Sequence, residues 1–186
     1  MKNPKEWRYT GQVDDLGSDR TTCEWCGQNG LRYKFEIENK VDKELIYVGS
    51  ECINKFDITV EDERGRVLAK RQSEKRLMKD KNRLIKKTRH ERVINAMLKL
   101  ANEDASVNFH DFISYYKDRN AFTPNQLSLL LWKLKKNNIE IDKKDFQLIL
   151  RRNREKDQLI SMPNWKVEQL WDCMSSTQKD WYKHSA

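Results

Sequence analysis

The chain has 186 residues, enough for one domain or two small ones. Its hydrophobic content of 37% and charged content of 35% are polar for a globular protein, but an aromatic content of 10% argues against disorder. No apolar run reaches the roughly 18 residues needed to cross a bilayer, and the first ten residues, MKNPKEWRYT, contain no apolar signal core. We therefore expect a cytoplasmic protein that does not enter a membrane.

The formal net charge of +8 is distributed unevenly along the chain. Residues 1–63 contain 9 basic and 14 acidic side chains, and residues 93–186 contain 15 and 12. Residues 64–92 contain 13 basic and only 3 acidic side chains. The basic character therefore belongs to one segment in the middle of the chain.

A small β structure is expected in the N-terminal third. Tyr33, Phe35 and Ile37 alternate with charged residues, which is the period-two pattern of a half-buried strand. A second short strand is expected over Leu45 to Val48. A further edge strand is expected around Trp7, whose ring would cover a module too small to bury its own core.

Three cysteines flank these strands. Cys23 and Cys26 form a Cys-x-x-Cys-Gly knuckle, and Cys52 follows the Gly49-Ser50 turn, where a helix is expected to begin. In a cytoplasmic chain, cysteines at such spacing indicate metal ligands more than disulfides. The three thiolates predict a structural Zn²⁺ site. The alternative is a metal-free, reduced cysteine pair with a buried third cysteine.

The fourth zinc ligand is not evident from the spacing, although structural zinc takes four protein ligands. In a knuckle-plus-helix site it would fall at Lys55, which cannot serve, and Asn39 offers only an amide. Cys173 is the only other thiol in the chain and is the preferred candidate, which requires the C-terminal part to fold back. The other candidates are Asp57, His90, His110 and His184.

The motifs CxxCG from Cys23, RYxFxIxN from Arg32 and VGSxCIxKF from Val48 together resemble a family of small, mostly uncharacterised proteins of bacteriophages and mobile elements. The resemblance covers about 35 of the 186 residues. It implies zinc binding, a bacterial cytoplasmic setting and a role in phage or mobile-element biology. It lends no defined activity.

The basic segment predicts a long helix. Thr59 and Asp62 have the spacing of an N-cap, and the pattern then favours a helix to about Leu100, with Gly65 as its weak point. Its apolar pairs are so widely separated that the helix is expected to contact other parts along one seam only. A wide basic face would then lie in water.

That basic face predicts nucleic-acid binding, because 13 cations in 29 residues repel one another unless an anion such as a phosphate backbone lies alongside. No base-reading motif is present, so we expect phosphate contacts to DNA or RNA with little sequence preference. The alternatives are an acidic host protein as partner and a merely solvated face. The candidate contact residues are Lys70, Arg71, Lys75, Arg76, Lys79, Arg83, Lys86, Lys87 and Arg89.

A set of short helices is expected over residues 102–186. Thr123 and Gln126 have the spacing of a capping box, which Ser175 and Gln178 repeat. Asp142 is expected to begin another helix. The tryptophans of this part are interpreted as packing anchors more than stacking platforms. They are Trp132, Trp165, Trp171 and Trp181.

An enzymatic function has little support in the sequence. Glu36, Glu38 and Lys40 at a strand end are compatible with a metal-dependent nuclease in which Asp14, Asp15 or Asp19 supplies a further acid, but Glu-x-Lys is common by chance. No Ser–His–Asp order, phosphate-binding glycine loop or His-Glu-x-x-His motif is present. No small-molecule substrate is inferred.

Together these patterns predict an α+β protein in three parts: a zinc-supported, zinc-ribbon or treble-clef-like β module over 1–58, a long basic helix over 59–101, and an α-helical domain over 102–186. The expected function is non-catalytic binding of nucleic acid by an accessory or regulatory phage protein. The alternative is a phage protein that binds and modulates a host complex of defence or transcription. A metal-dependent nuclease is a minor alternative.

Overall fold

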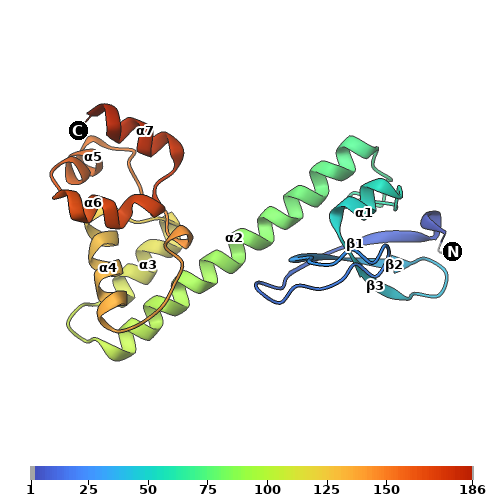
Figure 1. The fold of residues 1–186 in the computed structure, drawn as a ribbon, viewed down its shortest axis with the longest axis horizontal. Coiled ribbons are helices and arrows are strands. Elements are labelled where there is room, and N and C mark those ends of the chain that lie inside the picture. The colour runs from blue at the N-terminus through green and yellow to red at the C-terminus, as the bar shows by residue number, and fades with distance from the viewer. Residues whose placement is uncertain (1–2, 186) are drawn as a thin grey trace. The chain divides into compact units, whose positions relative to one another are not determined.

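The computed structural model describes residues 3–185 and has the α+β fold that the sequence predicts (Figure 1). The chain forms two compact units, Met1–Lys87 and Thr88–Ala186. The first contains the sheet, and the second is built of helices. Within the part of the chain that the structure describes, no helix is both long enough and apolar enough to cross a membrane.

Three strands precede most of the helices along the chain. The strands are β1 (Trp7–Asp15), β2 (Tyr33–Asn39) and β3 (Leu45–Val48). The α-helices are α1 (Ser50–Lys55), α2 (Lys70–Glu103), α3 (Phe109–Arg119), α4 (Pro124–Lys136), α5 (Asn153–Ile160), α6 (Asn164–Leu170) and α7 (Ser176–Ser185). Single 3₁₀ turns cover Pro4–Glu6, Lys143–Asp145 and Trp171–Cys173.

The sheet of the first unit is an antiparallel meander in the order β1-β2-β3. Phe35 and Ile37 of β2 pair with Val48 and Ile46 of β3, and all four side chains are buried. The predicted alternation of β2 and the predicted bounds of β3 are confirmed. Trp7 is also buried in this core, as expected for a residue that covers a small module.

Strand β1 is kinked by a bulge. Its register against β2 shifts between Tyr9 and Val13, so that two extra residues of β1 lie in the bulge. Gly11 lies there with a φ of 93°, a conformation that residues with a Cβ rarely adopt.

The prediction that a helix begins near Thr59 is wrong, because Thr59 lies in extended backbone beside β1. The Thr59 N–H donates to the Trp7 carbonyl, and the Tyr9 N–H donates to the Thr59 carbonyl. Asp62 caps a tight turn instead of a helix, since its carboxylate accepts the N–H groups of Arg64 and Arg66. Helix α2 therefore begins 11 residues later, at Lys70.

Helix α2 belongs to both units, because the boundary between them falls between Lys87 and Thr88. In the first unit it buries a narrow seam that includes Leu77 and Asp80, packed with the sheet core. In the second unit it buries Val93, Met97 and Leu100 in the helical core. The predicted single seam of contacts is therefore present, but it serves two different cores.

The second unit packs α3 to α7 around one apolar core with the last turns of α2. The capping box at the start of α4 is confirmed, because Gln126 N–H donates to the Thr123 hydroxyl and the Thr123 N–H donates to the Gln126 amide oxygen. Ser175 and Gln178 make the same pair of hydrogen bonds before α7. Phe122, which precedes the first box, is fully buried.

The prediction of a helix from Asp142 is wrong beyond a single 3₁₀ turn. The Phe122 N–H donates to the Gln147 carbonyl, and the Ile149 N–H donates to the Phe122 carbonyl, so this segment pairs as extended chain. The Asp145 carboxylate is buried and bonds the Arg92 guanidinium at 2.7 Å. These tertiary contacts replace helical hydrogen bonds until α5 begins at Asn153.

Candidate functional site

Three cysteine sulfurs converge in the first unit. The Sγ of Cys52 lies 3.1 Å from that of Cys26 and 3.6 Å from that of Cys23. All three are free thiols, and these separations far exceed a disulfide bond of about 2.05 Å. They approach the roughly 3.8 Å between sulfurs that a tetrahedral site with zinc–sulfur bonds of about 2.3 Å requires. The three predicted ligands therefore form a group that can hold a metal ion.

The knuckle is held in place by its own backbone. The Gly27 N–H donates to the Cys23 carbonyl, closing the turn, and the Cys23 N–H donates to the Gln28 carbonyl. Gly27 has a φ of 74°, which explains why glycine follows the second cysteine. The Glu24 N–H donates to the carbonyl of Tyr47 in β3, which fixes the knuckle against the strand that leads to Cys52.

The surroundings of Cys23 and Cys52 shift the pKa values of their thiols in opposite directions. Burial alone would raise the pKa of Cys23, but the N–H groups of Cys26, Gly49 and Trp25 donate to its sulfur and lower the pKa of this thiol. Burial and the neighbouring thiols of Cys26 and Cys23 raise the pKa of Cys52. A bound metal ion would therefore have to displace the proton of Cys52.

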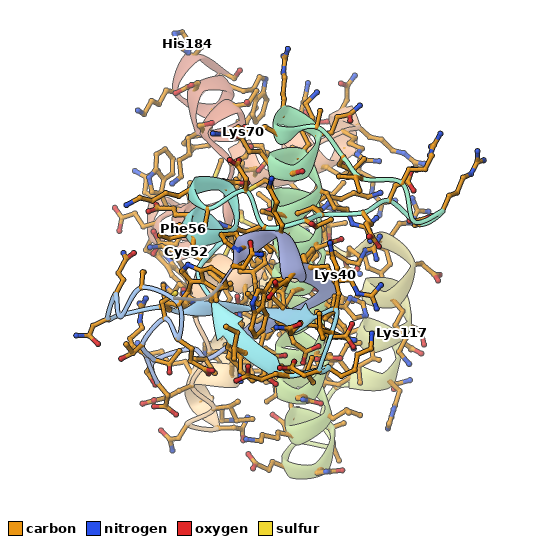
Figure 2. The ribbon with its side chains drawn as sticks, turned by 90° about the vertical axis from the view of Figure 1, so that its right-hand side faces the viewer. Lys40, Cys52, Phe56, Lys70, Lys117 and His184 are labelled. Carbon is orange, nitrogen blue, oxygen red and sulfur yellow. The ribbon has the colours of Figure 1, made fainter. Side chains whose placement is uncertain are left out.

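Aromatic rings pack beside the thiols. The Trp25 ring lies 5.8 Å from the rings of Trp7 and Phe56, measured between centroids. Phe56 follows α1, one turn after Cys52 (Figure 2). Cys23 and Cys52 are buried, whereas Cys26 is exposed. The group is thus covered on one side and open to solvent on the side of Cys26.

The structure does not bring Cys173 to this group. Cys173 lies in the apolar core of the second unit, and its thiol donates to the Lys143 carbonyl at 3.3 Å. Burial raises the pKa of Cys173 to about 12, so the thiol stays protonated at neutral pH. Among the described residues the metal-binding group contains the three cysteines and no fourth histidine, cysteine or carboxylate.

Asp57 follows α1 in the first unit, but its carboxylate is not a member of the group of three cysteines. The three histidine candidates belong to the second unit. The His90 ring stacks on Tyr116 and bonds the Asn120 side chain, and the His184 ring bonds a carbonyl of its own helix. His110 is exposed on α3, in the second unit. The group that could hold a metal ion therefore consists of three cysteines among the described residues.

Comparison of the chain with protein-family models, with curated proteins and with solved structures found no match. The resemblance of the cysteine segment to phage proteins therefore stays a prediction.

The nine predicted nucleic-acid contacts fall into two groups. Arg76 bonds the buried Asp80 carboxylate at 2.8 Å, and Arg89 lies 3.9 Å from the Asp145 carboxylate, so both contribute to internal ion pairs. Lys87 has an internal interaction as well. Six others are exposed and form no ion pair with any described residue. They are Lys70, Arg71, Lys75, Lys79, Arg83 and Lys86.

Four of these six lie on one side of α2 and form what we call the basic face: Arg71, Lys75, Lys79 and Lys86. Their spacing of four, four and seven residues places them in one row on a helix, opposite the buried seam. At a rise of 1.5 Å per residue the row is about 22 Å long. The part of α2 that carries it lies entirely in the first unit.

The carboxylates considered for a nuclease are held by neighbouring groups. The Arg8 guanidinium bonds Glu38 at 2.7 Å, and Glu36 accepts the hydroxyls of Thr10 and Tyr47. Asp14 and Asp15 pair with Lys34 and Arg32. No carboxylate cluster that could hold a metal ion is present among residues 3–185.

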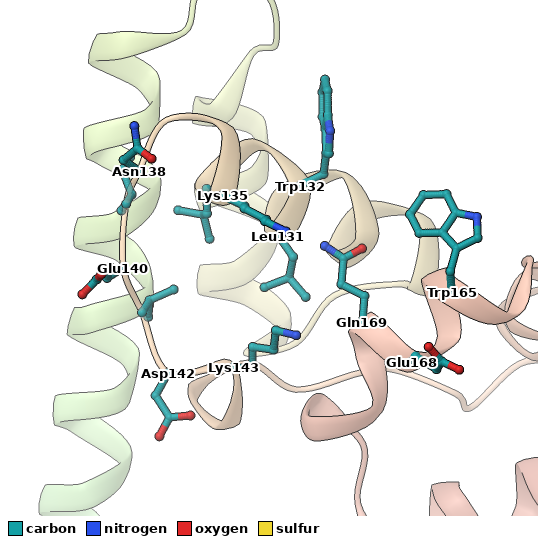
Figure 3. Close-up of a pocket in the computed structure, with 13 residues that line it drawn as sticks. Leu131, Trp132, Lys135, Asn138, Glu140, Asp142, Lys143, Trp165, Glu168 and Gln169 are labelled. Atoms are coloured by element: carbon teal, nitrogen blue, oxygen red, sulfur yellow. The ribbon is translucent and has the colours of Figure 1, made fainter.

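Two tryptophans predicted as packing anchors are exposed instead. Trp132 and Trp165 expose 48% and 61% of their surface and line an open groove of about 1090 Å³. Figure 3 shows them on α4 and α6, with Gln169 between them. A lysine lies over each of these rings, with the Lys136 Nζ 5.5 Å from the Trp132 ring centroid and the Lys166 Nζ 5.4 Å from that of Trp165. Trp171 and Trp181 are partly buried against the core, as predicted.

Proposed function

We propose that the chain is a non-catalytic, zinc-containing protein that binds nucleic acid by contacting phosphates with the basic face of α2. The observation that carries this proposal is the row of exposed cations Arg71, Lys75, Lys79 and Lys86, none of which pairs with an acidic side chain among the described residues. Each cation placed on a phosphate would release condensed counterions and strengthen binding.

The geometry of the row suits a phosphate backbone. Neighbouring cations four residues apart are separated by about 6 Å along the helix axis. That distance is close to two base-pair steps of about 3.4 Å each, measured along the axis of a duplex. Long lysine side chains can adapt to the remaining mismatch, so the face has no requirement for a particular base sequence.

The start of α2 supports the same conclusion. Lys70 and Arg71 stand in the first turn of the helix, which contains no acidic residue. Cations at this end are disfavoured by the helix dipole and by the unpaired N–H groups, whereas an anion there is favoured. A bound phosphate would offset this unfavourable arrangement.

Zinc is the metal that the cysteine group fits best. Three thiolates are soft ligands, and zinc takes such ligands in tetrahedral sites without redox chemistry. A knuckle, a hairpin and a cysteine in the first turn of α1 form a treble-clef-like arrangement in which the second helix ligand is replaced by Lys55. The ion would join the knuckle to α1 and so hold the module that packs against α2.

The proposal is tested by binding of labelled duplex DNA, single-stranded DNA and RNA, measured by fluorescence anisotropy. We expect the wild-type protein to bind at least one of them at low salt. The triple variant Lys75→Glu, Lys79→Glu, Lys86→Glu should bind at least about a hundredfold more weakly, because each reversal replaces attraction to a phosphate by repulsion.

A matched control makes the test specific for the basic face. The triple variant Lys99→Glu, Lys117→Glu, Lys144→Glu changes the net charge equally at exposed lysines of the second unit. It should retain most of the wild-type affinity. Equal weakening by both triple variants would show that only net charge matters and would contradict the proposal.

The phage setting and a regulatory role rest on the sequence resemblance alone. An acidic host protein remains the rival partner for the same face. Failure of the wild-type protein to bind any of the three nucleic acids would favour that rival.

A further inference from the structure

A second basic site lies in the helical unit and has no role in the proposed function. It is a pocket of about 830 Å³ between α3, the start of α4, the 147–155 segment and α7. Four arginines line it: Arg119, Arg151, Arg152 and Arg154. The only carboxylate in its lining belongs to Glu155.

The arginines of this pocket are not neutralised by the protein. None of the four forms an ion pair within residues 3–185, whereas Arg92 and Arg89 of the same unit pair with Asp145. The Glu155 carboxylate is already engaged, since it accepts the backbone N–H groups of Arg151 and Arg152 at 2.6 and 2.9 Å. The pocket therefore has an excess of positive charge.

Three helix starts add to this charge. Asn125 and Gln126 belong to the first turn of α4, Arg154 and Glu155 to that of α5, and Gln178 to that of α7, and all of them line the pocket. The N-terminal end of each helix bears a partial positive charge. Arginine side chains and helix starts around one pocket form the kind of environment in which proteins bind phosphate.

The rest of the lining offers groups for something larger than a phosphate. Gln158 lines the pocket, and its buried Oε1 has no hydrogen-bond partner among the described residues. Gln147 and Tyr115 add an amide and an aromatic ring. Amide side chains and aromatic rings are the groups that bind base edges and base faces. The volume lies in the range of small-molecule sites.

We propose that this pocket binds a nucleotide phosphate, either as a free nucleotide or as the 5′-phosphorylated end of a nucleic-acid strand. The arginines bind the phosphate, and the Gln147 amide and the Tyr115 ring contact the base. The inference depends only on residues of the second unit. It does not require that the basic face of α2 binds nucleic acid.

Isothermal titration calorimetry of the full-length protein tests this inference with AMP, adenosine and orthophosphate at physiological ionic strength. We expect AMP to bind at least about tenfold more tightly than either adenosine or orthophosphate, since each probe lacks one half of the contacts. No binding of AMP, or orthophosphate binding as tightly as AMP, would overturn the proposal.

Two variants locate the site. Arg151→Gln with Arg154→Gln should weaken AMP binding at least about tenfold, because charge-assisted hydrogen bonds to the phosphate are lost. The matched double variant Lys99→Gln with Lys117→Gln removes the same charge from exposed positions outside the pocket and should leave AMP affinity unchanged. An equal loss of AMP affinity in both double variants would mean that AMP is attracted only by the net charge of the protein and that the pocket is not its binding site. Circular dichroism confirms that each variant is folded.

A trinucleotide with and without a 5′-phosphate then distinguishes the two sources of the ligand. Tighter binding of the phosphorylated trinucleotide than of AMP assigns the pocket to strand ends, and the reverse order assigns it to free nucleotides. Each order supports the inference. Equal binding of the phosphorylated and unphosphorylated trinucleotides, with AMP bound no better, would contradict it.

Discussion

The Tyr9 hydroxyl lies 3.3 Å from the Oδ2 of Asp80, joining the sheet of the first unit to the first half of α2. Both side chains are buried, and the same Asp80 oxygen accepts the Arg76 guanidinium at 2.8 Å. Asp80 is thus a buried charged residue in the seam along which α2 contacts the β module. The basic face points away because this seam fixes the rotation of the helix.

Alkaline pH should destabilise the first unit through Tyr9. Burial and the neighbouring Asp80 charge raise the pKa of Tyr9 above its ordinary value. A raised pKa means that the folded state retains its proton longer than the unfolded chain, whose tyrosine titrates near 10. The stabilisation is therefore present below pH about 10 and is lost as the pH rises above it.

The variant Tyr9→Phe isolates this effect. At neutral pH it should cost about 1 kcal/mol, the net value of one hydrogen bond, since Asp80 keeps its bond to Arg76. Denaturant unfolding between neutral and strongly alkaline pH should show a smaller loss of stability in the variant than in the wild type. Identical pH profiles for the two proteins would contradict the assignment.

Removal of one of the three proposed metal ligands should loosen the first unit alone. Cys26→Ser leaves two thiols, so we expect the zinc content to fall well below one ion per chain and the amides of residues 23–60 to exchange faster with deuterium. The amides of the second unit should be unaffected. Elemental analysis and hydrogen exchange measured by mass spectrometry provide the two readouts.

Cys173→Ser is the matched control for that variant. It removes a thiol that lies in the core of the second unit, so the zinc content should remain at the wild-type value. Loss of zinc in this variant would restore Cys173 as the fourth ligand. Absence of stoichiometric metal from the wild type would remove the metal centre from the account.

Acid should weaken the second unit through the pair of Lys133 and Asp104. The Lys133 ammonium is buried and bonds the Asp104 carboxylate at 2.7 Å. This bond, with those from Ser106, lowers the pKa of Asp104. Because the pKa of Asp104 is lower in the folded state, the ionised carboxylate stabilises the fold at any pH above about 3.9, the pKa of an aspartate in the unfolded chain. This stabilisation is lost as the pH falls below that value.

Asp104→Asn should lower the melting temperature at neutral pH, since it leaves a buried ammonium without its counter-charge. It should also flatten the fall in stability on acidification. Thermal unfolding of both proteins at neutral pH and near pH 3 measures each effect. A variant as stable as the wild type at neutral pH would show that the pair contributes nothing.

Local sequence patterns predicted the parts of the fold that depend on neighbours in the chain. The alternation in β2 and the box of Thr123 and Gln126 are set by strand periodicity and by hydrogen bonds between residues three apart. The convergence of Cys23, Cys26 and Cys52 also follows from local structure, because a knuckle, a hairpin and a turn bring them together.

Elements fixed by distant contacts were mispredicted. Thr59 has the spacing of an N-cap, but pairing with β1 places it in extended backbone. Asp142 likewise begins only a single turn, because Phe122 pairs with the residues that follow. Glycine at position 65, with a φ of 74°, was the one local sign that the helix begins later.

The sequence predicts which segment carries the basic face, but it does not predict which residues of that segment belong to the face. The charge count identified the segment, yet only the fold shows that Arg76 and Arg89 turn inward to Asp80 and Asp145. The arginine pocket was missed for the same reason. Arg119 and Arg151 are distant in sequence, and only the packing of α3 against the 147–155 segment brings both into one lining.

The salt dependence of binding to duplex DNA tests the central claim most directly. With four to six phosphate contacts, the logarithm of the association constant should fall with the logarithm of salt concentration with a slope of about −4 to −5. The variant Lys75→Gln, Lys79→Gln, Lys86→Gln should reduce the magnitude of that slope by about 3. A slope that stays at the wild-type value in this variant would contradict phosphate binding by the basic face.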